Sequence, residues 1–138
     1  MRARGLISQV SYGGHSFVAF AKDIKIAHSI FALPFAASVF FLTDVPMPTL
    51  QQMLLLFIAM VSARSFAMGM NRYLDRDIDR LNERTQNRAI PSGRLKPQAC
   101  LGWSLVWAAV FIGTSFALNQ LAGYCSFGVL VILGCYPF

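Results

Sequence analysis

The sequence predicts an all-α membrane protein, a polytopic bundle of about four transmembrane helices. Its 138 residues are 56% hydrophobic and only 13% charged, whereas soluble domains carry about a quarter charged residues. Four apolar segments approach the roughly 20 residues that a helix needs to cross a bilayer. The basic residues cluster before the first segment and between the second and the third. A chain of this length holds one domain.

The four predicted spans cover residues 26–43, 50–70, 99–118 and 121–138. They must be helical, because a lipid-exposed backbone has to satisfy its hydrogen bonds internally. Pro34 lies inside the first span, where we expect a kink or an irregular turn. Further along the chain, residues 91–93 read Pro-Ser-Gly and predict a turn before the third span.

The positions of Lys and Arg predict the orientation. The connections at 44–48 and 119–120 contain no basic residue, whereas the residues before the first span and those between the second and third spans are basic. Cytoplasmic connections carry the excess of Lys and Arg. The sequence therefore predicts a multi-pass protein of the cell inner (cytoplasmic) membrane with a cytoplasmic N-terminus. The basic residues of these two stretches are Arg2, Arg4, Lys22, Lys25, Arg72, Arg76, Arg80, Arg84, Arg88, Arg94 and Lys96.

The segment before the first span, residues 1–22, is predicted to be a cytoplasmic tail or a short surface helix. Ser11, Gly13, Gly14 and His15 interrupt any apolar stretch that could form a signal peptide. Cys100, Cys125 and Cys135 lie in or beside apolar stretches and are interpreted as small core residues.

Polar residues mark one face at the end of the second span. At 100° per residue, Arg64, Asn71 and Asp75 lie within about 40° of one another, and Asp79 lies about 40° further round. Two carboxylates at i,i+4 repel by a few tenths of a kcal/mol, and Mg²⁺ would remove that repulsion. A charge inside an apolar span, as at Arg64, favours a functional site.

Two structural alternatives apply to this face. The first is a solvated, salt-bridged helix end, because basic residues recur every four positions beside the acids. Under the second, Arg64 extends to the membrane surface and has no functional partner. The recurring basic residues are Arg72, Arg76, Arg80, Arg84 and Arg88.

The pattern Asn71-x-x-x-Asp75-x-x-x-Asp79 resembles the first aspartate-rich motif of the UbiA prenyltransferase family. Residues 82–93, Asn-Glu-Arg-Thr-Gln-Asn-Arg-Ala-Ile-Pro-Ser-Gly, resemble the loop that follows the motif in that family, and residues 25–35 resemble its first helix. The likeness covers roughly residues 22–138. It implies that residues 23–138 are the N-terminal half of a UbiA-type bundle, which we expect to be truncated because the fourth span is still apolar at Phe138.

The resemblance implies an aromatic polyprenyltransferase of quinone biosynthesis. Asn71, Asp75 and Asp79 would bind Mg²⁺ and the diphosphate of a polyprenyl donor. Arg64 and Arg88 would meet the diphosphate or the carboxylate of an aromatic acid acceptor, with bidentate geometry. His28 is a further candidate for acceptor contact, although packing or capping is the commoner role of such a residue.

The sequence departs from the family pattern in two ways. Arg72 follows Asn71, where many members that use 4-hydroxybenzoate have Asp. This form is more like a subgroup linked to menaquinone precursors, so the acceptor stays open between 4-hydroxybenzoate and a dihydroxynaphthoate. The family's second aspartate-rich motif is absent, since Glu83 is the only acid after Asp79. We therefore expect no activity from this chain alone, and association with a complementary half or with itself.

A second reading belongs to a different class of protein. A small non-enzymatic membrane protein could use the basic connection to bind anionic lipid or a partner subunit. A role with nucleic acid is not expected, because the basic residues flank apolar spans and have no soluble domain beside them.

Overall fold

The computed structural model describes residues 16–22, 38 and 48–135. It shows a helical segment at 16–22, followed by α3 (Leu50–Leu74), α4 (Arg76–Leu81), α5 (Pro97–Leu118) and α6 (Gln120–Cys135). The described residues form no strand, and the all-α prediction is confirmed. The predicted first span, with His28 and Pro34, lies outside the described residues.

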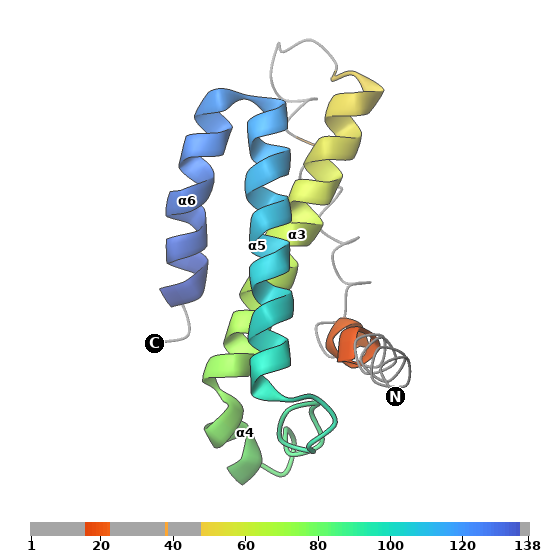
Figure 1. Cartoon of the computed structure of the whole chain (residues 1–138), viewed down its shortest axis with the longest axis vertical. Coiled ribbons are helices and arrows are strands. Elements are labelled where there is room, and N and C mark those ends of the chain that lie inside the picture. Colours follow the sequence, from red (N-terminus) through yellow and green to blue (C-terminus); the bar gives the residue numbers. More distant parts are fainter. Residues whose placement is uncertain (1–15, 23–37, 39–47, 136–138) are drawn as a thin grey trace, which may run out of the picture.

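Helices α3, α5 and α6 run side by side, and each is antiparallel to the next (Figure 1). α3 and α5 are long and apolar enough to cross a membrane, and they match the predicted spans at 50–70 and 99–118. Few of their side chains are buried, as expected for helices that face lipid. α6 falls in the fourth predicted span, but its 16 described residues give a length of about 24 Å. That is short of the roughly 30 Å hydrocarbon core. Two helices of the described part therefore qualify as spans, and the first predicted span and the end of the fourth lie outside that part.

Local sequence signals fix the helix ends. Thr49 and Gln52 form a capping box at the start of α3, in which each side chain accepts a hydrogen bond from the other residue's backbone N–H. The Asn119 Oδ1 accepts from the Leu121 N–H at 2.9 Å between α5 and α6. The predicted turn at 91–93 is confirmed, and Gly93 occupies it with a φ of +77°, a conformation that favours glycine.

Small residues form the contact between α3 and α5. A Cβ placed on Gly69 would lie only 2.2 Å from Ser104 Oγ, so the two backbones approach closely there, as in many membrane helix pairs. The buried hydroxyls of Ser62 and Ser104 donate to the carbonyls of Ile58 and Cys100 in their own helices. Their hydrogen-bonding needs are therefore met without a polar partner across the interface.

The three cysteines differ in their surroundings. Cys100 is buried in this contact, and its thiol donates to the Gly69 carbonyl at 3.5 Å. Cys125 and Cys135 are exposed on α6, so the prediction of a core position was wrong for these two. Apolar sequence surroundings do not distinguish a lipid-facing position from a packed one.

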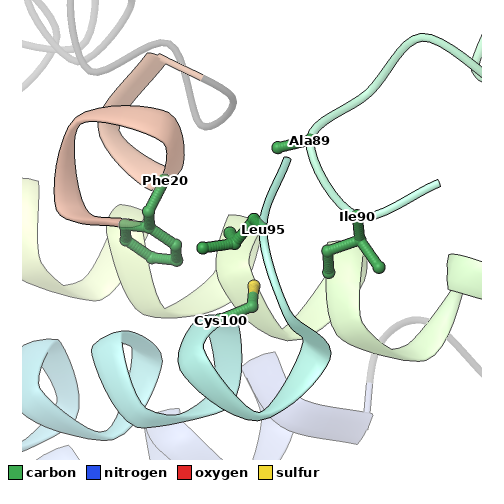
Figure 2. Close-up of a cluster of buried hydrophobic side chains, with 5 residues drawn as sticks. All are labelled: Phe20, Ala89, Ile90, Leu95 and Cys100. Carbon is green, nitrogen blue, oxygen red and sulfur yellow. The ribbon is translucent and has the colours of Figure 1, made fainter. Parts of the chain in front are cut away.

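A second cluster joins the segment at 16–22 to the loop at 82–96. Phe20 is only 1% exposed and packs with buried side chains of the loop and of α5 (Figure 2). Phe17 packs against Trp103 with ring centroids 4.8 Å apart and the ring planes tilted by 56°. Of the two expectations for residues 1–22, a short helix therefore holds for the described part. The cluster consists of Phe20, Ala89, Ile90, Leu95 and Cys100.

Candidate functional site

The three residues of the aspartate-rich motif lie on successive helical turns. The Asp75 N–H donates to the Asn71 carbonyl at 2.9 Å, and the Asp79 N–H donates to the Asp75 carbonyl at 2.8 Å. These i to i−4 bonds continue across the junction at Asp75, where α3 ends and α4 begins. The spacing that the sequence predicted for the motif is therefore kept.

The motif faces away from α5. At 100° per residue, Arg64, Asn71 and Asp75 lie about 140–180° from the centre of the buried face of α3. Arg64 is exposed, and Asn71 and Asp75 are half-buried. The contact with α5 therefore does not involve the motif face. The buried face consists of Ala59, Ser62, Ser65, Phe66 and Gly69.

Asn71 and Asp75 offer side-chain oxygen atoms that the rest of the described chain does not use. Neither the Asn71 carboxamide nor the Asp75 carboxylate has a hydrogen-bonding or ionic partner among the residues that the structure covers. Carboxylate and amide oxygens are donors that Mg²⁺ accepts in proteins, usually together with waters and substrate phosphates. These two residues therefore fit a magnesium ion that shares its coordination with a diphosphate.

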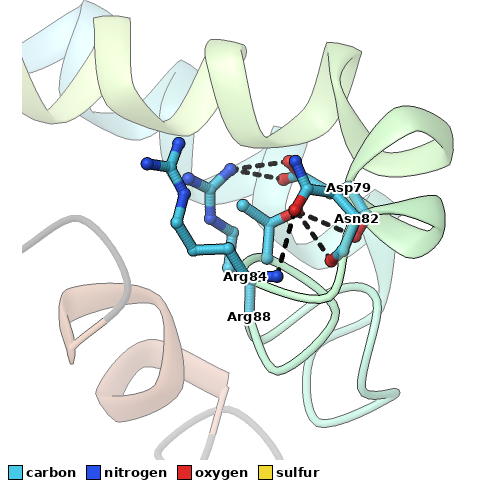
Figure 3. Close-up of polar contacts among 5 residues, drawn as sticks. Asp79, Asn82, Arg84 and Arg88 are labelled. Carbon is cyan, nitrogen blue, oxygen red and sulfur yellow. Dashed lines mark hydrogen bonds and ion pairs between the residues drawn. The ribbon is translucent and has the colours of Figure 1, made fainter.

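Asp79 differs from Asp75, because the following loop holds it (Figure 3). Nη1 of Arg88 lies 2.7 Å from both carboxylate oxygens of Asp79. The Thr85 hydroxyl donates to the Asp79 backbone carbonyl at 2.9 Å. The Asp79 side chain is only 8% exposed, and the ion pair compensates for the burial of its charge.

From the sequence, Asp79 and Arg88 were each expected to bind a ligand, whereas in the structure they pair with each other. Asp79 and Arg88 neutralise each other, and both carboxylate oxygens of Asp79 are engaged by the pair. Within the described residues, no three His, Cys, Asp or Glu side chains form a group that could hold a metal ion. Asn71 and Asp75 remain the available part of the predicted site, and predicted candidate His28 lies outside the described residues.

Sequence reasoning missed Thr85. Its hydroxyl lies within reach of two carbonyls at the end of α4, those of Asp79 and Asn82, and its side chain is buried. A threonine placed three residues after Asn82 was a usable signal, because short hydroxyl side chains bind nearby backbone groups in turns.

The row of arginines is not one helix face. α4 ends at Leu81, and Arg84 and Arg88 lie in the turns that follow. The alternative of a salt-bridged helix end holds for Arg76, which lies 3.7 Å from the exposed Asp77 and over the ring of Tyr73. An exposed pair of this kind contributes little to stability.

Comparison with known proteins places these features. A model of the UbiA prenyltransferase family matches residues 31–138. The chain is 32% identical to a 4-hydroxybenzoate octaprenyltransferase of Aeromonas salmonicida, over 67% of the chain and 32% of the relative. It is 33% identical to the enzyme of the same name from Pseudomonas putida, over 66% of the chain and 31% of the relative.

A relative whose name gives a different activity has a similar identity to this chain. The chain is 33% identical to a protoheme IX farnesyltransferase of Streptomyces avermitilis, over 67% of the chain and 31% of the relative. The chain spans about a third of the length of the curated relatives it matches. No solved structure matches it significantly.

Proposed function

Because the chain belongs to the UbiA prenyltransferase family, we propose that it forms the donor-binding part of an aromatic polyprenyltransferase. The donor is a polyprenyl diphosphate and the acceptor an aromatic acid, either 4-hydroxybenzoate or a dihydroxynaphthoate, in quinone biosynthesis. Relatives named 4-hydroxybenzoate octaprenyltransferase support this acceptor class. The farnesyltransferase relative supports prenyl transfer without supporting the acceptor.

One observation carries the proposal: Asn71 and Asp75 lie on successive turns of one helix, and their side-chain oxygens have no partner among the described residues. These two residues would hold Mg²⁺ together with the donor's diphosphate. The ion would neutralise the charge that develops on the departing diphosphate. One helix face supplies too few ligands to complete an octahedral shell, so we propose that metal and diphosphate bind together.

Arg64 is proposed to bind a second anionic group. It lies ten residues before the end of α3 at Leu74, about 15 Å along the helix, and it has no partner within the described part of the chain. A charge at that depth is expensive in lipid. A phosphate or the acceptor's carboxylate would offset that cost, because a guanidinium binds either with two parallel hydrogen bonds.

The proposed location is the inner membrane, with the N-terminus and the loop at 82–96 in the cytoplasm. The segment at 16–22, α4 and that loop lie at the same end of the bundle (Figure 1). Because this chain has a single acidic motif, we propose that transfer needs a complementary set of helices, or a second copy, to close the cavity.

Replacing Asp75 tests the assignment. We expect D75N to reduce Mg²⁺-dependent binding of a polyprenyl diphosphate to this chain, and the equivalent change to reduce prenyl transfer by a full-length relative about a hundredfold. Helix content measured by circular dichroism should not change. D77N is the matched control, because Asp77 is exposed on α4 and lies off the motif face. Normal binding and transfer by D75N would rule out the site.

A second candidate function rests on the exposed basic side chains at the same end, those of Arg80, Arg84, Arg94 and Lys96. They could bind anionic lipid, with about 1 kcal/mol per basic residue near the surface. Lipid binding of this kind is lost at high salt and does not respond to D75N. That response separates the two functions.

A further inference from the structure

We propose that Arg88 is an exchangeable counter-ion. It pairs with Asp79 while the site is empty, and it pairs with the diphosphate once a divalent cation has bound to Asp79. This inference rests on the proposed function and deepens it. It assigns Arg88 two successive partners and makes the second carboxylate of the motif available only when ligand binds.

The geometry of the pair suits exchange. A single nitrogen of Arg88, Nη1, makes both contacts with the Asp79 carboxylate, each at 2.7 Å. The stronger fork arrangement uses two guanidinium nitrogens in parallel. Arg88 therefore keeps its remaining N–H donors for another acceptor while it is paired. Its side chain is 27% exposed, so these donors are open to an approaching anion.

The charges at the motif make Arg88 and a divalent cation compete for Asp79. Asp75 and Asp79 are one turn apart, and their mutual repulsion is relieved at Asp79 by Arg88. A divalent cation between the two carboxylates would relieve it more strongly, and the guanidinium would then face a cation. A diphosphate bound together with the cation would then be the better partner for Arg88.

The loop backbone allows the side chain to move without unfolding the loop. The Arg88 N–H donates to the Thr85 carbonyl at 2.9 Å, and the Arg88 carbonyl accepts from the Ser92 hydroxyl at 2.6 Å. The next two residues, Ala89 and Ile90, are buried. Thr85 also holds the loop to Asp79 through the backbone. Exchange therefore requires only that the Arg88 side chain rotate about its own fixed backbone.

Calorimetric titration of the purified chain in detergent tests the exchange. The probes are Mg²⁺ alone and inorganic pyrophosphate in the presence of Mg²⁺. Removing the competing guanidinium in R88Q should strengthen binding of Mg²⁺ alone by about tenfold, and should weaken binding of pyrophosphate with Mg²⁺ by about tenfold. R84Q is the matched control, because Arg84 projects from the same series of turns but does not contact Asp79 (Figure 3).

The test depends on the two affinities of R88Q changing in opposite directions. If R88Q and R84Q change both affinities equally, loss of positive charge alone explains the result and the exchange is overturned. If the wild-type chain binds neither Mg²⁺ nor pyrophosphate, the proposed site fails and the exchange fails with it. R88K guards against misfolding, since it keeps the charge and should bind Mg²⁺ alone as weakly as the wild type. Tight binding of Mg²⁺ by R88K would also contradict the exchange.

Discussion

Gly69 is the residue at which three parts of the chain meet. A side chain there would collide with Ser104 Oγ at 2.2 Å and with the ring of Phe20 at 2.9 Å. Ser104 and Phe20 are both buried, so neither has free space into which to move. The close approach of α3, α5 and the segment at 16–22 therefore depends on the absence of a Cβ at this position.

We expect G69A to destabilise the protein by about 1–3 kcal/mol, because overpacking a tight contact shifts side chains and backbone. Thermal unfolding in detergent, followed by circular dichroism, measures the effect. G113A is the control on α5, where a Cβ would meet nothing within 4 Å. It should be neutral or more stable by up to about 1 kcal/mol. Equal effects of the two substitutions would show that helix propensity, and not packing, decides the outcome.

At the scale of single residues, the sequence predicted the spacing of the motif but not which of its side chains would be paired. Asn71, Asp75 and Asp79 follow from helical spacing, and the backbone bonds confirm that spacing. The pairing of Asp79 with Arg88 joins residues nine positions apart across a non-helical turn, where no periodicity applies. The fold of the turn had to be known before the pair could be found.

The loop at 82–96 behaves as an element in its own right. Internal hydrogen bonds hold it, among them the one from the Leu95 N–H to the Ala89 carbonyl at 2.9 Å. Its buried side chains pack against Phe20. A loop with its own core and its own backbone bonds is able to present Arg88 at a fixed place.

Removing the aromatic ring that covers this loop tests the idea. We expect F20A to loosen the loop, because truncating a buried Phe typically costs about 3–5 kcal/mol. Trypsin should then cleave faster after Arg84 and Arg94. V18A is the control, because Val18 is 51% exposed on the same segment. Unchanged cleavage in F20A would mean that the loop is held by its backbone alone.

The helices were largely predictable and this loop was not. The predicted span at 50–70 became α3, which extends to Leu74, and the span at 99–118 became α5, which starts at Pro97. Hydropathy identifies such helices because lipid imposes one composition along their whole length. The loop core uses a few apolar residues and a partner far away in the sequence, Phe20, and these leave no local pattern.

At the scale of the whole molecule, the two ends of the bundle differ in charge. The end with the loop at 82–96 carries the basic residues, whereas the turn at Asn119 and Gln120 carries none. Hydropathy predicted the bundle, and the charge asymmetry predicts an orientation that stays a prediction. They did not predict that the motif would face away from α5, because both helices are apolar nearly all round.

Labelling of single cysteines tests the orientation. In a background without the native cysteines, N87C should react with a membrane-impermeant maleimide only after the cells are opened, because Asn87 lies in the basic loop. N119C should react in intact cells. Both side chains are exposed, so access, and not burial, decides the result. Labelling of N87C in intact cells would invert the topology.

The position of Cys100 gives the protein a chemical reporter of its own assembly. Its thiol is closed off where α3 meets α5, whereas the thiols of Cys125 and Cys135 lie open on α6. Once those two are replaced by serine, alkylation of the remaining thiol requires α3 and α5 to separate. The rate of that reaction therefore measures how often this helix pair opens within an intact membrane, without a denaturant or an added label.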